Sequence, residues 1–480
     1  MTAPEAAGPV GLPAADAADT PAARAGALRR NAIGVPGMIF MVVAATAPLT
    51  ALSSNISLSL GFGTGASTVL LLVLVGLVLA VFAAGYVVLS RYVTSAGAYQ
   101  AFVEFGLGRR AGAATAFVAT LAYTIAAAGM VAATGYFAAL TWSPLTGADV
   151  PWWAFAAVAL VVTYGLGVRG VEIAQHVTTG ISVLQFAIIG ALAVAILVGN
   201  PGGWSVPVLS PTAAFGPGLA MTLVFCLLCF GGFEATAAYG EEARAPRRSI
   251  AVATYAALGI LVVVFALGTW TLAAAFDDVR AVAAEDPGAL VVTAADRYLG
   301  GWSGPVLSGL VTISFLAAAV AFHNLASRYL FALGRSGLLP RSLAAVHHRH
   351  DTPFVGCRTQ AVVAMLLLVP FAVVGADPIV NLFPALSGIT SLALVAMMIG
   401  CCVSLIVAAL RGRVGETRWA TVVAPGVAGA VLAAVLVLIV GHYAEVTGSD
   451  ALVVALMPLS LVVVAAYGVV AATLSRKDES

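Results

Sequence analysis

The stretch CLLCFGGFEATAAYGEEARAPRRS, residues 226–249, sets a carboxylate beside a glycine pair at the end of an apolar segment. Glu234 follows Gly231 and Gly232, and a second acidic pair and three arginines come after it. Because lipid offers no water to freed backbone groups, a broken helix is tolerated in a bilayer only inside protein or along a wet cavity. An ionisable side chain at that depth marks a candidate functional site. If this stretch crosses a membrane, function is expected here.

The composition places the chain in a membrane. Charged residues make up 9% of the 480 residues and hydrophobic residues 61%, whereas a soluble domain has about a quarter charged residues. The net charge of +1 gives no reason to expect a nucleic-acid partner. The five cysteines lie in or beside apolar segments, and the pair Cys226 and Cys229 has no histidine nearby. We therefore expect packing thiols, no metal site and no cofactor.

About twelve segments are apolar enough to span a bilayer as helices of ~20 residues. They begin near residues 33, 67, 113, 152, 173, 217, 250, 302, 358, 379, 419 and 450. Residues 1–27, rich in Ala, Pro, Asp and Thr, are expected to form a disordered cytoplasmic tail. Residues 28–475 are expected to form one transmembrane domain.

The basic residues indicate the orientation. With the N-terminus in the cytoplasm, all of the 22 Lys and Arg residues except Arg280 and Arg297 fall on the cytoplasmic side. Cytoplasmic loops carry such an excess of positive charge. The sequence therefore predicts a multi-pass protein of the cell membrane with both termini cytoplasmic.

The first span is interrupted like the sixth. Pro48 lies at mid-depth, and proline removes a backbone donor and clashes with the preceding turn. A kink padded by hydroxyl groups would give the same pattern. Two interrupted spans, five apart, instead indicate two five-helix halves of opposite orientation at about residues 30–200 and 215–410, with helices 11 and 12 at about 418–474. Paired interruptions of this kind point to the midplane binding site of a transporter.

Three longer stretches carry a family resemblance. They are SRYVTSAGAYQAFVEFGLGRRAG at 90–112, FCLLCFGGFEATAAYGEEARAPRRSI at 225–250, and NLASRYLFALGRSGLLPRSLAAVHHRHDTPFVG at 324–356. In order, they resemble the loop between helices 2 and 3, the sixth helix with its following loop, and the exit of the eighth helix of the amino acid–polyamine–organocation superfamily of secondary transporters. The last includes the Arg-x-Gly-x-Leu-Pro and Thr-Pro elements.

The resemblance implies an all-helical, LeuT-like fold, a five-plus-five inverted repeat with helices 1 and 6 broken and two further C-terminal helices. Substrate in that family binds between the broken parts of helices 1 and 6, near helices 3, 8 and 10. Carried over to this chain, the substrate-binding residues are Ala45, Thr46, Ala47, Pro48, Leu49 and Thr50 in helix 1 and Phe230, Gly231, Gly232 and Phe233 in helix 6. Tyr123 in helix 3 is a further polar candidate that would face the cavity.

Two positions depart from the family pattern. Many amino acid carriers of the family have a Gly-x-Gly run in helix 1, whereas residues 45–48 here read Ala-Thr-Ala-Pro and offer fewer amides to a substrate carboxylate. The fifth helix of the family often carries Lys or Glu in place of a coupling ion, whereas this chain has Gln185, which cannot titrate. An α-amino acid substrate is therefore less firmly indicated, and a proton would need another carrier.

Glu234 is the candidate for proton coupling or gating. Burial favours the neutral form of a carboxyl group and a nearby ammonium favours the charged form, which would link a proton to an amine. The alternative is a carboxylate that only caps the second half of the helix. Phe230 and Phe233 would bind a substrate cation, close the pocket, or pack as core residues.

Four charged residues form a candidate cytoplasmic gate. Glu241 and Glu242 lie where the sixth helix leaves the membrane, on the same face as Arg91 and Arg328. Ion pairs among them would latch the gate. The alternative is a solvated charge cluster, in which exposed pairs contribute little.

These observations predict a secondary active transporter, not an enzyme, that moves amino acids or related amines by alternating access. Proton coupling or exchange is expected, and sodium coupling is less favoured because the eighth span offers Ser314 among mostly alanines. A polyamine or organic-cation permease is the alternative. A membrane receptor or enzyme is the remote one, since the sequence has no metal cluster, nucleophile elbow or phosphate loop.

Overall fold

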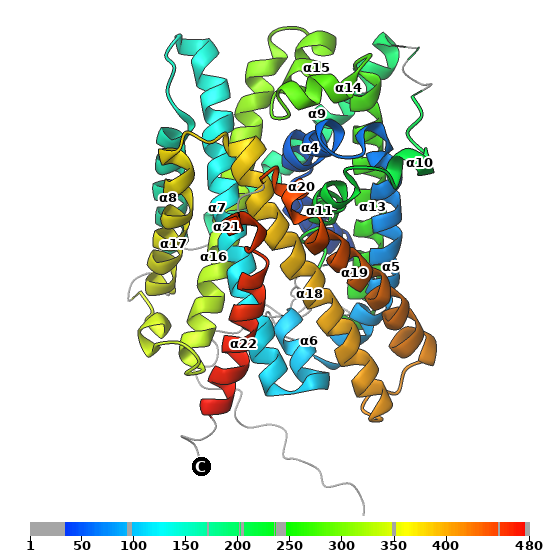
Figure 1. Cartoon of the computed structure of the whole chain (residues 1–480), viewed down its shortest axis with the longest axis vertical. Coiled ribbons are helices and arrows are strands. Elements are labelled where there is room, and N and C mark those ends of the chain that lie inside the picture. Colours follow the sequence, from blue (N-terminus) through cyan, green and yellow to red (C-terminus); the bar gives the residue numbers. More distant parts are fainter. Residues whose placement is uncertain are drawn as a thin grey trace, which may run out of the picture.

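The computed structural model describes residues 34–93, 98–169, 172–200, 202, 206–234, 236, 246–347, 352–449 and 452–475. Every regular element in these residues is a helix (Figure 1). The all-helical class is therefore confirmed, and it follows from the membrane, because a helix satisfies its backbone polar groups within one segment. The tail expected at residues 1–27 lies outside the described residues.

The first half of the chain runs from the first expected span to the fifth. Its helices are α2 Val35–Ala45, α3 Pro48–Ala51, the π-helix η1 Leu52–Ile56, α4 Ser57–Gly61, η2 Gly65–Ser67, α5 Thr68–Tyr92, α6 Ala98–Leu107, α7 Arg109–Thr146, α8 Trp152–Arg169 and α9 Glu172–Gly199. The interrupted first span is thus divided among α2, α3, η1 and α4.

The second half runs from the sixth expected span to the tenth, and the C-terminal helices follow it. Its helices are α10 Pro211–Ala214, α11 Leu219–Cys229, α13 Pro246–Ala274, α14 Val279–Glu285, α15 Leu290–Leu299, α16 Ser303–Arg335, η5 Arg341–Ala344, α17 Phe354–Val373, η6 Pro378–Leu382 and α18 Phe383–Leu410. The C-terminal elements are η7 Trp419–Val423, α19 Ala424–Gly441, α20 Tyr443–Thr447, α21 Leu452–Ala455 and α22 Leu459–Leu474.

Eight helices in the described ranges are long and apolar enough to cross a membrane. Three shorter apolar helices accompany them, at Val183–Gly199, Leu219–Cys229 and Leu459–Leu474. A helix begins near each of the twelve expected positions. The total of twelve spans stays a prediction, because the interrupted and shorter helices do not reach the length of a full span.

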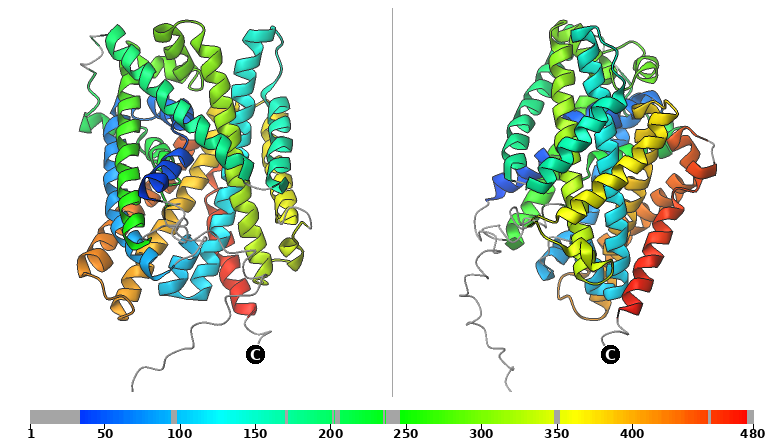
Figure 2. Two further views of the ribbon diagram at one scale, coloured as in Figure 1. Left: turned by 180° about the vertical axis from the view of Figure 1, so that it is seen from behind. Right: turned by 90° about the vertical axis from the view of Figure 1, so that its left-hand side faces the viewer.

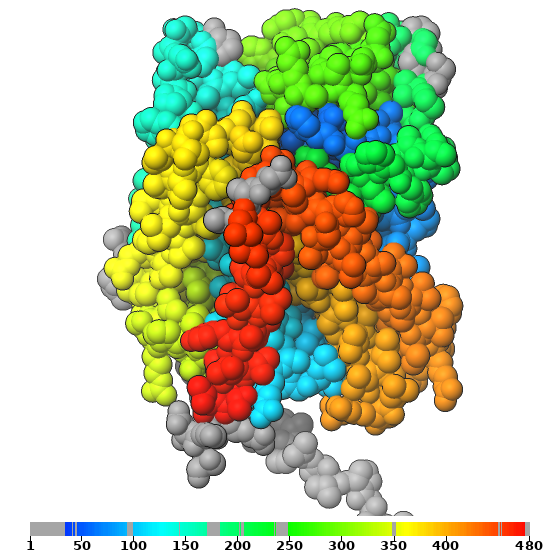
Figure 3. Space-filling model, viewed as in Figure 1, coloured from blue at the N-terminus to red at the C-terminus, as the bar shows by residue number. Residues whose placement is uncertain are grey.

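Helix α7 forms the centre of the bundle. Its most apolar window is 89% buried, whereas the corresponding windows of α8 and α17 are 22% and 28% buried. α7 packs against α6, α8, α16, α17, α18 and α22, and α8 and α17 lie at the edge of the bundle (Figure 2). In the space-filling view, α22 lies on the outer surface (Figure 3). The outer helices carry apolar side chains on exposed faces, as contact with lipid requires.

Helices α7 and α8 approach closely at Gly135. A Cβ atom at this position would stand 2.8 Å from the Cβ of Ala156 and against the backbone carbonyl of Trp152. Small residues let helices in membranes approach backbone to backbone. The crossing therefore depends on the absence of a side chain at residue 135.

Gly135→Ala is expected to lower the stability of the protein by about 1–3 kcal/mol, because an extra methyl group in a packed interface forces backbone shifts. The matched control is Gly190→Ala on α9, where an added Cβ meets nothing within 4 Å. The control is expected to leave stability unchanged or raised, because Ala favours a helix over Gly. Thermal unfolding of the purified variants in detergent measures both, and equal shifts would contradict the close crossing.

Candidate functional site

The first candidate segment, residues 45–50, is where α2 gives way to α3. Ala47, between the two helices, has φ 43° and ψ 69°. It is the only non-glycine residue with positive φ in the described part of the chain. This conformation costs an L-residue about 1–2 kcal/mol, and such strain concentrates at functional sites. Pro48 explains where α2 stops, because it has no N–H to continue the helical hydrogen bonds.

Hydroxyl groups beside the interruption donate to nearby backbone carbonyl groups. Thr46 Oγ1 donates to the carbonyl of Val43 at 2.8 Å, and Thr50 Oγ1 donates to the carbonyl of Ala47 at 2.6 Å. The protons of both hydroxyls are therefore engaged, while each oxygen keeps capacity to accept a hydrogen bond. Acceptors of this kind suit a substrate ammonium.

The second candidate segment follows the end of α11 at Cys229. Gly232 has φ 106°, a conformation open to glycine and costly for other residues. Its N–H donates to Oε2 of Glu234 at 2.9 Å, so the carboxylate folds back over the glycine turn. α3 packs against α11, which brings the two interrupted segments together.

Tyr86 contacts Glu234 directly, and three further tyrosines lie within electrostatic range of it. The hydroxyl of Tyr86 donates to the backbone carbonyl of Glu234 at 2.7 Å, and electrostatic interactions connect Glu234 with Tyr86, Tyr99, Tyr123 and Tyr329. The rings of Tyr123 and Tyr329 lie 5.6 Å apart. Tyr123 therefore lies within electrostatic range of Glu234, and its part in a substrate site stays a prediction. Tyr86 and Tyr329 were not predicted from the sequence. A polar hydroxyl inside an apolar span is the sequence pattern that could have indicated them.

Phe230 and Phe233 pack into the helical scaffold. The Phe230 ring lies 5.9 Å from that of Phe265 on α13, edge to face, and the Phe233 ring lies 6.1 Å from that of Phe82 on α5. Their exposures are 1% and 2%. In this conformation both are core residues, which is one of the alternatives that the sequence leaves open.

The expected gate residues do not meet within the described residues. Arg91 forms an ion pair with Glu416 at 2.9 Å, with side chains 32% and 33% exposed. Arg328 is exposed on α16 and makes no ion pair with a residue that the structure describes. Glu241 and Glu242 lie outside the described residues. An ion pair as exposed as Arg91–Glu416 contributes about 0–1 kcal/mol to stability. The predicted gate of Glu241, Glu242, Arg91 and Arg328 stays a prediction.

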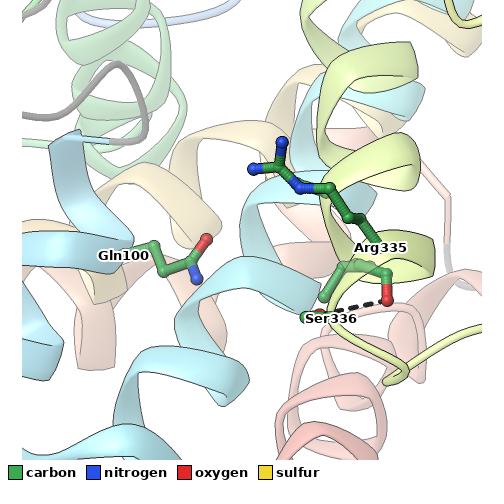
Figure 4. Close-up of a pocket in the computed structure, with 5 residues that line it drawn as sticks. Gln100, Arg335 and Ser336 are labelled. Carbon is green, nitrogen blue, oxygen red and sulfur yellow. Dashed lines mark hydrogen bonds between the residues drawn. The ribbon is translucent and has the colours of Figure 1, made fainter. Parts of the chain in front are cut away.

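A cavity of about 230 Å³ lies between α6 and α16. It is lined by Gln100, Ala332, Leu333, Arg335 and Ser336 (Figure 4). None of the predicted substrate-binding residues lines it. Pro48, Leu49 and Thr50 are buried, whereas Ala47, Gly231, Gly232 and Glu234 are half-buried. The cavity itself lies toward the α6 end of the bundle.

The opposite end of the bundle is closed by α14 and α15. Arg280 on α14 donates through Nη2 to the carbonyl of Gly63 at 2.6 Å. The N–H of Thr64 donates to Oγ1 of Thr222 on α11 at 2.9 Å. These bonds join the continuation of the first span to α11 and to the covering helix. The two ends of the molecule therefore differ, because α14 covers one end and the cavity lies toward the other.

Two polar groups on η1 add to the site. Ser53 Oγ and Asn55 Oδ1 are buried and have no hydrogen-bond partner among the described residues. Unpaired buried groups call for a functional explanation, and π-turns inside helices are frequent at functional sites. An amide side chain soon after Pro48 in an apolar span is the sequence signal for this residue.

Comparison with known proteins identifies related transporters. Residues 33–467 match the sequence profile of the family described as amino acid permease. The low-affinity putrescine importer PlaP of Escherichia coli strain K12 is 26% identical over 252 residues, which cover 50% of this chain and 54% of that protein. The aromatic amino acid transport protein AroP of Shigella flexneri is 27% identical over 281 residues, which cover 53% and 56%. The chain therefore spans only about half the length of these relatives.

The fold has a relative among solved structures. The crystal structure of MhsT in complex with L-phenylalanine superposes with a TM-score of 0.62 at 15% sequence identity, covering 86% of this chain and 100% of that one. MhsT has the LeuT fold. The LeuT-like fold expected from the sequence is therefore confirmed.

Tyr86→Phe is expected to lower the stability by about 1 kcal/mol, because the buried carbonyl of Glu234 loses its donor. Tyr99→Phe is the matched control, since the Tyr99 ring lies 6.2 Å from that of Tyr86 and its hydroxyl makes no hydrogen bond within the described residues. Unfolding of both variants in detergent provides the comparison. A Tyr99→Phe loss as large as that of Tyr86→Phe would show that the hydroxyl bond is not the cause.

Proposed function

The chain belongs to the amino acid permease family, and on that premise we propose that it is a secondary active transporter of amino acids or related amines. The two interrupted segments carry the proposal. Residues 45–50 lead into α3, which packs against α11, and residues 230–234 follow α11. The first segment contains the strained Ala47, and the second contains a carboxylate held over a glycine turn. Interrupted helices that meet in this way form the substrate sites of transporters.

The substrate carries an ammonium group in this proposal. Glu234 supplies a negative charge, and four tyrosine rings stand within its electrostatic reach. A carboxylate and aromatic faces both stabilise a cation in a water-poor site. The relatives named for putrescine import and for aromatic amino acid transport have amino-bearing substrates, which supports the same class.

A polyamine or organic-cation permease is the second candidate. It is favoured by the sparse supply of donors for a substrate carboxylate, because Pro48 has no N–H and the N–H of Leu49 is already bonded to Gln185. It is disfavoured because the interrupted segments contain only one acidic residue, Glu234, whereas a substrate with two positive charges would favour more. The membrane receptor and the enzyme considered from the sequence have no support in the family.

Proton coupling or exchange is the coupling mode that we propose. Ser314, the hydroxyl that a sodium site on the eighth span would use, donates to the carbonyl of Leu310 and accepts from Gln185. Glu234 then carries the proton in this scheme.

The transport cycle alternates access between the two ends. The closed α14–α15 end and the cavity at the α6 end support a conformation that opens toward the α6 side. The excess of Arg and Lys on that side makes it cytoplasmic in our proposal, with both termini there. Residues 28–475 form the transporter domain, with the repeats and C-terminal helices at the limits given from the sequence.

Uptake into proteoliposomes tests the proposed function. We expect at least one labelled amino acid or amine to accumulate when a proton gradient, acid outside, or the same compound inside is provided. Each amino acid is paired with its decarboxylated amine, because a preference within a pair decides between the amino acid and the polyamine alternatives. Uptake that requires sodium and ignores a proton gradient would contradict the coupling mode, and uptake of no compound would contradict the function.

Glu234→Gln is expected to abolish stimulation by an acid-outside gradient, because the amide keeps the shape of the side chain and cannot take up a proton. Glu445→Gln, which changes an exposed carboxylate on α20, is the control and should retain the stimulation. Initial rates at several external pH values measure the effect. An unchanged pH dependence in Glu234→Gln would exclude this residue as the proton carrier.

A further inference from the structure

The side chain of Gln185 connects three helices at the first interruption. Its Oε1 accepts from the N–H of Leu49 on α3 at 3.2 Å, and its Nε2 donates to Oγ of Ser314 on α16 at 3.0 Å. Gln185 is 2% exposed and Ser314 is 1% exposed. Both bonds are therefore shielded from water. In such an interior a hydrogen bond is stronger, and an unpaired polar group costs more, than at the surface.

The start of α3 cannot satisfy the Leu49 N–H locally. The first residues of a helix have N–H groups without an intrahelical partner, and a side chain at the N-cap usually accepts from them. Here the N-cap is Ala47, which has no side-chain acceptor, and Pro48 has no N–H. Leu49 is fully buried, so water does not fill the gap. The partner comes instead from α9.

The direction of each bond requires an amide at residue 185. The Leu49 N–H can only donate, so it needs an acceptor. The hydroxyl proton of Ser314 goes to the carbonyl of Leu310 at 2.7 Å, so Ser314 Oγ takes a donor from Gln185. A neutral amide supplies one acceptor and one donor, whereas a carboxylate supplies acceptors alone and leucine neither.

We propose that Gln185 is a positioning residue that caps α3 from a distance and holds the interrupted first helix against α9 and α16. In this role the bond to Leu49 sets the orientation of residues 45–50 and of α3, which packs against α11. If α2 and α3 move during transport, either this hydrogen bond breaks or α9 moves together with them. The consequence for transport rests on the proposed function, whereas the capping role does not.

A second buried glutamine provides a matched control. Gln360 on α17 is 0% exposed, and its Oε1 accepts from Thr124 Oγ1 on α7 at 2.8 Å. It also joins two helices through a buried amide, but α17 lies at the edge of the bundle (Figure 1). Replacing either glutamine therefore removes a buried amide that joins two helices. Only the replacement of Gln185 affects the interrupted helix.

The first experiment measures the Leu49 amide itself. Labelling with 13C-carbonyl proline and 15N-leucine selects leucines that follow a proline, and the chain has three of these, at Leu49, Leu145 and Leu459. In nanodiscs, Gln185→Leu is expected to speed hydrogen exchange at Leu49 about tenfold, as loss of one buried hydrogen bond predicts. Leu145 and Leu459 should not change, and Gln360→Leu should change none of the three. Unchanged exchange at Leu49 in Gln185→Leu would overturn the proposal.

The second experiment uses transport and does not depend on tolerance of leucine. In Gln185→Glu the neutral acid retains an acceptor for Leu49 and a donor for Ser314, whereas the ionised form loses the donor. The uptake rate relative to wild type is therefore expected to fall about tenfold from acidic to alkaline pH, while Gln360→Glu shows no such trend. A flat ratio for Gln185→Glu would remove its role in transport. If wild type itself transports nothing, the proposed function fails, and the exchange experiment still decides the capping role.

Discussion

A backbone N–H inside a membrane has to find its acceptor within the protein, and this requirement governs the centre of the molecule. Pro48 ends α2, and the next free donor, the N–H of Leu49, is accepted by Gln185 from another helix. The glycine turn after α11 leaves a second donor, the N–H of Gly232, and Glu234 accepts it. One interruption is thus completed by a neutral amide and the other by a side chain that can take up a proton.

This difference assigns separate roles to the two interrupted segments. The first is held by side chains that keep their charge at every pH, so it is suited to fixed geometry. The second contains Glu234, which accepts from Gly232 and whose carbonyl accepts from Tyr86, and in the proposed cycle this is the group that responds to a proton or a substrate ammonium. Arg280 ties the α14–α15 end to the first span, so in the proposed cycle a change at Glu234 acts on the side of the bundle that holds the cavity. Proton and amine are linked at one carboxylate in the proposed cycle.

Much of the fold could be read from the sequence, because lipid makes long apolar segments and their interruptions conspicuous. The interruptions at Pro48 and at the glycine pair follow from that constraint, and the functional role of Glu234 stays a prediction. The contacts of Phe230 and Phe233 could not be predicted, because their ring partners, Phe265 on α13 and Phe82 on α5, belong to other helices that no local pattern links to them.

Contacts between residues far apart in the chain also could not be predicted from sequence patterns. Gln185 lies 136 positions from Leu49, and Arg91 lies 325 positions from Glu416, so no local periodicity links them. The inability of Gln185 to titrate suggested a residue without a role in coupling, and its hydrogen bonds instead give it a structural position at the interrupted helix. Glu241 and Glu242 stay as sequence predictions.

The central claim is that substrate binds between residues 45–50 and 230–234 with its ammonium beside Glu234. A structure of the full chain determined with the best transported compound tests this most directly. The account predicts the amino group within about 4 Å of the Glu234 carboxylate, the distance at which opposite charges pair, with Tyr123 or Tyr329 beside it. A compound bound instead between α6 and α16, next to Gln100 and Arg335, would contradict it.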